Sequence, residues 1–238
     1  MKATRLIMLM AILAVTVSAE AQLRKTVYAR GEVTTEDRQA GSFNSVNVST
    51  GITVYLSQGD KESIRVEADE NLHEYIVTEI RGGVLNIYSE FNIRNAKSRK
   101  VYVTIKEVKS LKTSSAGDIK GQTPFTADML TLATSSAGDI NLEVRANEVR
   151  ATTNSSGDIT LKGSADKLTA DLSSAGDLNA FDFTVREADI TASSAGDATI
   201  TVTETLKARA SSAGDIHYRG KPKNVDAHSS SAGSIRGF

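Results

Sequence analysis

One six-residue phrase recurs seven times between residues 114 and 235, and it constrains the fold more than any other feature. Its consensus reads Ser-Ser-Ala-Gly-Asp-Ile, and its glycines are spaced by 21, 19, 19, 20, 18 and 19 residues. These glycines are Gly117, Gly138, Gly157, Gly176, Gly196, Gly214 and Gly233. A nearly fixed period of this length is typical of a solenoid, in which each repeat packs against its two neighbours.

The residues around each copy alternate between apolar and polar. In the second repeat, Leu130, Leu132, Ile140 and Leu142 share one parity. Period two indicates extended strands with one buried face. A repeat of 18 to 21 residues is too short for a strand with a crossover helix, which takes about 30 residues. We therefore predict an all-β fold, a single-stranded right-handed parallel β-helix with coils stacked about 4.8 Å apart.

The alternation also assigns directions within the phrase. It places the second serine, the glycine and the residue after aspartate inward, and the first serine, the alanine and the aspartate outward. We expect the glycines to form a structural corner at positive φ, which glycine adopts readily. The second serines would then form an internal ladder of Ser115, Ser136, Ser155, Ser174, Ser194, Ser212 and Ser231.

The outward aspartates should stack in a row of like charges. They are Asp118, Asp139, Asp158, Asp177, Asp197 and Asp215. Neighbours about 4.8 Å apart repel by about 0.9 kcal/mol even in water. The favoured interpretation is that each carboxylate caps its own turn through backbone N–H groups. The alternative is a Ca²⁺ ion bridging the row, although the calcium-binding β-helices have a nine-residue repeat that does not match. No other cofactor or metal is expected.

Residues 1–21 have the features of a secretory signal peptide. A basic start precedes the apolar run Leu6 to Val17, and Ala19-Glu20-Ala21 forms a cleavage site. The run is too short to span a bilayer as a helix, and no later segment is apolar enough to do so. We expect an exported protein, located in the periplasm, at the cell surface or outside the cell.

The rest of the chain divides into two parts. We expect residues 111–238 to form the seven-coil β-helix and residues 22–110, which lack the phrase, to be strand-rich. Gly51-Ile52 resembles a degenerate corner, and 69–77 is a short helix candidate. We expect the first part to continue or cap the solenoid, because an open β edge invites aggregation.

Composition excludes several classes of protein. The absence of cysteine rules out disulfides and thiolate metal sites, and a net charge of −1 gives no reason to expect nucleic-acid binding. The chain has no tryptophan and only 5% aromatic residues. That composition disfavours an aromatic platform for carbohydrates and leaves open sugar binding through polar groups.

Nothing in the sequence singles out a catalytic site. The carboxylates recur identically, whereas glycoside cleavage needs one defined pair. His73, His217 and His228 do not cluster in sequence, and no nucleophile-elbow motif is present. No catalytic residue is expected.

Two stretches carry a resemblance to a known family. One runs from Phe43 to Leu56 and continues through Gln58-Gly59-Asp60; the other is the repeated phrase. Together they resemble the head GIN domain family of putative auto-transporter adhesins over nearly all of the predicted mature chain. The resemblance implies an exported bacterial β-helix protein that acts as an adhesin, and it carries over no catalytic residues.

Three functions are compatible with these observations. The first is a non-enzymatic adhesin or binding module whose regular polar face recognises an envelope protein or a glycan. The second is a structural or assembly protein of the periplasm that self-associates through its C-terminal coil, 229–235. The third is a polysaccharide-processing β-helix enzyme. The sequence identifies neither the ligand nor the side of the outer membrane.

Overall fold

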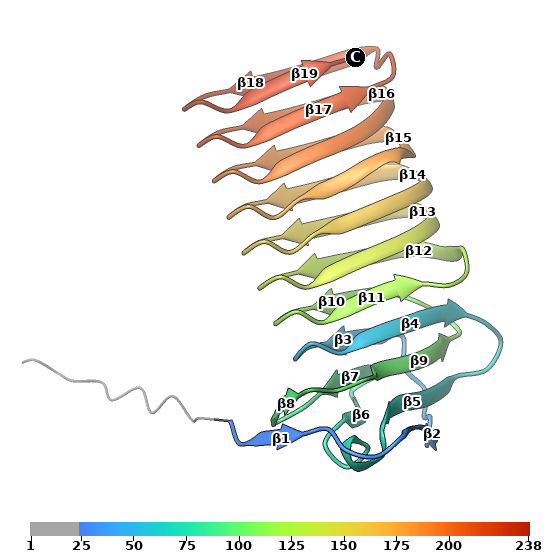
Figure 1. The fold of residues 1–238 in the computed structure, drawn as a ribbon. Helices are drawn as coiled ribbons and strands as arrows, with labels where there is room; N and C mark the ends of the chain where they lie inside the picture. Colours follow the sequence, from blue (N-terminus) through green and yellow to red (C-terminus); the bar gives the residue numbers. More distant parts are fainter. Residues whose placement is uncertain (1–23) are drawn as a thin grey trace, which may run out of the picture.

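The computed structural model describes residues 24–238, so the predicted signal peptide lies outside the described residues. Seventeen strands form one continuous sheet that winds into a stack of coils (Figure 1). The strands of neighbouring coils pair in parallel, in the register that the phrase predicts: Asp118 lies beside Asp139, and Ile140 beside Ile159. The predicted all-β parallel β-helix is thereby confirmed.

The repeated part contains ten strands. They are β10 (Ser110–Thr113), β11 (Asp118–Gly121), β12 (Phe125–Thr134), β13 (Asp139–Thr153), β14 (Ile159–Leu172), β15 (Leu178–Ala192), β16 (Asp197–Ala210), β17 (Asp215–Arg219), β18 (Asn224–Ser229) and β19 (Ser234–Gly237). Strands β13 to β16 each run from one copy of the phrase to the next, bending midway. A regular coil is therefore one long bent strand closed by one tight turn.

The core is a set of apolar columns inside the coils. The residue after aspartate forms one column, in which Ile119, Ile140 and Ile159 are at most 1% exposed. Burying a side chain of this size stabilises the fold by roughly 1.5–3 kcal/mol relative to leaving it in water. The alternating pattern thus lines the interior of the stack, and this part of the inward prediction is correct.

The tight turn differs from the prediction in its backbone. Ser115 and Ala116 have φ values of 50° and 57°, and the Gly117 N–H donates to the Ser114 carbonyl oxygen at 2.9 Å. Two central residues at positive φ are the mark of a type I′ turn. None of the phrase glycines has a positive φ. They do stand at the corner, as predicted, but the left-handed residues are the serine and the alanine before them.

The predicted internal serine ladder is also wrong. All seven second serines are exposed, because a left-handed turn interrupts the strand alternation and directs them outward. In three coils the inward place before the turn is taken instead by Thr113, Thr134 and Thr153, each at most 3% exposed. Their hydroxyl groups have no hydrogen-bond partner among the described residues.

The first part of the chain extends the same solenoid. Strand β3 (Ser45–Val48) pairs in parallel with β10, and β4 (Thr53–Gln58) pairs with β11. Between them, Thr50 and Gly51 have φ values of 63° and 67° and occupy the places of Ser115 and Ala116. The degenerate corner therefore exists, displaced by one residue from its expected alignment. Below it, β7 (Val84–Tyr88) pairs with β3 and β9 (Arg99–Ile105) with β4.

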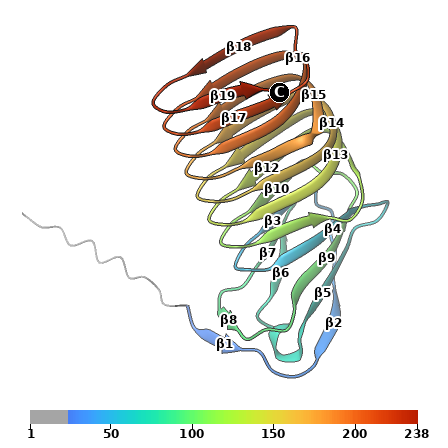
Figure 2. The ribbon, with the colours of Figure 1, turned by 45° about the horizontal axis from the view of Figure 1, so that its top comes forward.

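Antiparallel strands close the N-terminal end (Figure 2). Strand β5 (Ser63–Asp69) pairs with β9, β2 (Val33–Arg38) with β5, and β6 (Val77–Arg81) with β7. A separate pair joins β1 (Thr26–Tyr28) to β8 (Asn92–Arg94). The expected helix over 69–77 is only the single 3₁₀ turn η1 (Glu70–Leu72). Among the described residues, no helix has the length and apolarity to cross a membrane.

Candidate functional site

The predicted aspartate row lies on the outer face of the coils, directly after each turn. Asp118 stacks beside Asp139, and Asp197 beside Asp215. The Asp197 N–H donates to Asp177 Oδ1 at 3.1 Å, and the Asp215 N–H donates to Asp197 Oδ1 at 3.0 Å. Backbone groups therefore do bind carboxylates, as expected, but the donor belongs to the following coil and not to the same turn.

Burial, and repulsion between neighbouring carboxylates, raise the pKa of aspartates in this row. Partial burial raises the pKa of Asp118, and the neighbouring Asp139 charge raises it further. The same two causes raise the pKa of Asp158, whose neighbours are Asp177 and Asp139. Burial also raises the pKa of Asp177, against the effect of its hydrogen bond from Asp197. Ionisation of Asp118, Asp158 or Asp177 therefore disfavours the folded state.

A Ca²⁺ ion needs six to eight oxygen ligands that converge. Over residues 24–238, no three or more histidine, aspartate or glutamate side chains gather in a way that could hold a metal ion. The aspartates form a line along the stack and not a cage. Bridging of the row by Ca²⁺ stays the untested alternative.

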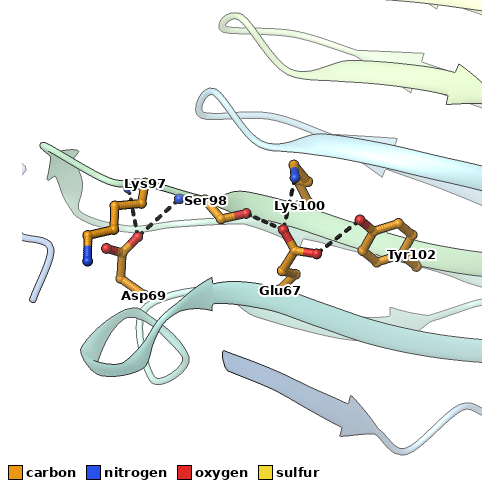
Figure 3. A network of polar contacts seen from close by, with 6 residues as sticks. All are labelled: Glu67, Asp69, Lys97, Ser98, Lys100 and Tyr102. Atoms are coloured by element: carbon orange, nitrogen blue, oxygen red, sulfur yellow. Dashed lines mark hydrogen bonds and ion pairs between the residues drawn. The ribbon is translucent and has the colours of Figure 1, made fainter. Parts of the chain in front are cut away.

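The row continues into the N-terminal cap as a network of mixed charges. Thr53 lies beside Asp118, Lys100 beside Thr53, and Glu67 beside Lys100. The Glu67 carboxylate accepts hydrogen bonds from Lys100 Nζ at 2.9 Å, Ser98 Oγ at 2.8 Å and the Tyr102 hydroxyl at 3.0 Å (Figure 3). Three donors on one carboxylate fix the side chains of β5 and β9 relative to each other.

These contacts set the charge states of the network. The Lys100 and Ser98 hydrogen bonds lower the pKa of Glu67, and the same Glu67 contact raises the pKa of Lys100. Burial, followed by the hydrogen bond to Glu67, raises the pKa of Tyr102. At neutral pH the network therefore holds one ion pair and a neutral phenol.

A second carboxylate anchors the loop that enters β9. Asp69 is 1% exposed, and its Oδ2 accepts the backbone N–H groups of Lys97 at 2.8 Å and Ser98 at 3.1 Å (Figure 3). These hydrogen bonds satisfy the buried carboxylate, which would otherwise be costly to bury. Ser98 is thereby placed against Glu67.

An aromatic pair lies next to the network and was missed by the sequence analysis. Tyr55 on β4 and Tyr102 on β9 stack with ring centroids 5.3 Å apart and planes 18° apart. The overall aromatic content argued against such a surface. A usable signal was present, because both tyrosines occupy outward positions between buried residues, Val54 and Leu56 in one strand and Val101 and Val103 in the other.

The three histidines remain apart in the structure. The His73 ring contacts Thr34 in the cap, with Nε2 2.9 Å from Oγ1. The His217 ring packs against Phe238, and the His228 ring lies beside Asp226 on β18. His73 Nδ1 also lies 3.5 Å from Glu36 Oε2, so the described residues hold two separate histidine–carboxylate pairs and no histidine cluster.

Comparison with solved structures supports the fold. The chain is similar to a putative adhesin from Bacteroides fragilis (19% identity, TM-score 0.85, covering 89% of this chain and 100% of that one). It is also similar to a putative adhesin from Parabacteroides distasonis (22% identity, TM-score 0.72, covering 90% of this chain and 100% of that one). A third similar structure is a putative adhesin from Parabacteroides merdae (21% identity, TM-score 0.73, covering 90% of this chain and 99% of that one). At these identities the likeness establishes the fold.

Two further comparisons concern sequence. No curated protein matches the chain significantly. A family model described as "Putative auto-transporter adhesin, head GIN domain" matches residues 42–222, which include the cap from β3 onward, the first coils and most of the repeats. This agrees with the resemblance carried by the N-terminal strands and the phrase. The chain is a member of the head GIN domain family of putative auto-transporter adhesins.

Proposed function

We propose that this protein is a non-enzymatic adhesin of the cell envelope, a rigid rod that binds an extended partner along its outer faces. The observation that carries the proposal is the in-register stacking of coils, which repeats outward side chains at a constant spacing. Family membership supports an adhesive role. Regular solenoid faces suit long ligands, since one ligand can contact several repeats at once.

The absence of a catalytic role is part of this proposal. A general acid in glycoside cleavage needs a raised pKa, whereas the hydrogen bonds from Lys100 and Ser98 lower the pKa of Glu67. Burial is the largest cause of the raised pKa in each of Asp118, Asp158 and Asp177, so the shift does not single out one of them as a general acid. We also propose export to the periplasm or the cell surface, because membership of the adhesin family supports it as it supports adhesion.

Binding of the purified protein to a glycan array and to isolated envelope polysaccharides tests the proposal. We expect saturable binding that survives washing and disappears when the protein is heat-unfolded. Failure to bind any glycan or envelope component would contradict it. Reproducible shortening of a polysaccharide during the incubation would instead support the enzyme alternative.

One observation favours a second candidate, assembly through the C-terminal coil. Among the described residues, β18 and β19 have no strand paired on their far edges, and Val225 on β18 is 48% exposed. An open parallel edge favours strand addition by another copy. Sedimentation should then show concentration-dependent association that Val225→Lys removes and Met129→Lys, a change at an exposed side position, does not. A monomer at every concentration would contradict this candidate.

A further inference from the structure

A groove opens on the outer face of the cap, between β9 and β2. It is lined by Thr35, Asp37, Ser63, Arg65, Glu67 and Tyr102, and its volume is about 440 Å³, within the usual range of small-molecule sites. Every lining residue is polar or aromatic. The groove thus offers hydrogen-bonding groups beside one aromatic face.

The Tyr102 ring forms one wall of this groove, and its position is fixed by contacts within the protein. Strands β4 and β5 flank β9 on opposite sides, so Tyr55 covers one face of the Tyr102 ring and the other face borders the groove. The Tyr102 hydroxyl is held by Glu67 at 3.0 Å. A ring fixed at both its face and its hydroxyl loses little conformational entropy when a ligand stacks on it.

Arg65 and Asp37 provide the polar side. Arg65 lies opposite Tyr102 in the β5–β9 pairing, but its Nε donates to Asp37 Oδ1 on β2 at 2.6 Å, and this draws the guanidinium away from the tyrosine. The Arg65 hydrogen bond lowers the pKa of Asp37. Charge-assisted hydrogen bonds from such groups are stronger than those between neutral groups.

The charges of the groove balance in pairs. Asp37 is compensated by Arg65, and Glu67 by Lys100. A charged ligand would have to compete with one of these pairs, and a purely apolar ligand would leave the groove's donors and acceptors without partners. A neutral ligand with many hydroxyl groups meets neither penalty.

We infer that this groove binds a neutral pyranose unit of a glycan. The C–H face of the sugar stacks on Tyr102, and its hydroxyl groups bind the Asp37 carboxylate, the Arg65 guanidinium and the hydroxyls of Ser63 and Thr35. The inference rests on the proposed adhesin function and names its ligand class. Because the groove is open, we expect a dissociation constant of about 1 mM for one sugar unit, which repeated units would strengthen through avidity.

The test is a titration with methyl glucopyranoside and methyl galactopyranoside, with glucuronic acid as the charged comparison. The chain contains six tyrosines and no tryptophan, so tyrosine fluorescence reports the six tyrosines together, and the NMR chemical shifts of Tyr102 report the site itself. We expect saturable binding of at least one neutral glycoside and weaker binding of the acid. Tyr102→Ala should weaken binding about tenfold, and Tyr102→Phe should retain most of it.

Two further variants keep the test decisive. Ser63→Arg should block the groove while leaving the tyrosine pair in place, and Tyr28→Ala removes an exposed tyrosine outside the groove and should change nothing. Neutral glycosides that fail to bind, or that bind equally to wild type, Tyr102→Ala and Ser63→Arg, overturn the inference. If envelope polysaccharides still bind in that case, the adhesin function stands and only its placement here is wrong.

Discussion

Gly157 passes so close over Thr134 that it has no room for a side chain. A Cβ on Gly157 would lie 2.8 Å from Thr134 Oγ1 and 2.9 Å from the Ser135 nitrogen. The same relationship recurs one coil below, between Gly138 and Thr113, and one coil above, between Gly176 and Thr153. The glycine of the phrase is therefore required by the close approach of stacked coils.

Gly157→Ala should lower the free energy of unfolding by about 1–3 kcal/mol, because the added methyl group forces the backbone of adjacent coils apart. Urea denaturation followed by circular dichroism measures the change. Adding Thr134→Ala should recover only part of the loss, since the Ser135 backbone stays in place. Full stability in Gly157→Ala would show that the coils are less tightly stacked than described.

Ala137→Gly should be neutral or stabilising, whereas Ala137→Val should be destabilising. Ala137 has a φ of 59°, and a residue with a Cβ in this region is disfavoured by roughly 1–2 kcal/mol. Glycine removes that strain and loses some stability through greater freedom of the unfolded chain. Thermal unfolding of the two variants checks the turn assignment, which a marked loss of stability in Ala137→Gly would refute.

Asp158→Asn should raise stability at neutral pH and have little effect in acid. The folded-state pKa of Asp158 is raised above 3.8, so the folded protein holds this proton more tightly than the unfolded chain does. Its ionisation therefore lowers stability as the pH rises through that window. Unfolding measured from pH 3 to pH 7 should show the two proteins converge below about pH 3.8. Equal stability at neutral pH would contradict the raised pKa.

Glu67→Gln should destabilise the cap by a few tenths to about 1 kcal/mol at neutral pH, as expected for a partly exposed ion pair. The folded-state pKa of Glu67 is lowered below 4.5, so this stabilisation is present above that pH and disappears as the pH falls through the folded value. The pKa of Tyr102 should also move down toward its normal value. Ultraviolet titration of tyrosinate measures this, with Glu79→Gln, beside Tyr88, as the control.

Chelation should leave the melting temperature unchanged, and so should added CaCl₂, because the aspartates form a line without converging ligands. An ion that binds only the folded state would raise the melting temperature with its concentration. Calorimetry with EDTA and with millimolar Ca²⁺ distinguishes the cases. A calcium-dependent rise that Asp158→Asn reduces would establish the bridging alternative.

The regular coils were predictable because the sequence contains seven copies of the same alternating pattern and turn. Period-two alternation around Ile140 and Ile159 identifies the buried face, and the glycine spacing gives the coil length. The corner was predicted less well. The prediction assumed that side chains continue to alternate between the two faces through Ser136 and Ala137. Both residues have a positive φ, which breaks the alternation there. Short sequence patterns do not report φ when the residues are neither glycine nor asparagine.

The candidate binding groove could not be predicted from the repeat or from the alternation of apolar and polar residues. Tyr55 and Tyr102 become neighbours because β9, later in the chain, inserts beneath β4. Asp37 reaches Arg65 only through the antiparallel pairing of β2 with β5. Composition averages over the whole chain, so it could not show that scattered aromatic residues gather on one face.

By itself, the sequence determined the solenoid, its period and its apolar interior, because a repeat must bury the same face in every coil. Only the tertiary structure decided which residues of the turn are left-handed, why a side chain in place of its glycine would clash with the adjacent coil, and which distant strands of the cap meet. Those outcomes depend on separations of a few ångströms between chain segments that are far apart in sequence. Local sequence patterns do not determine such separations.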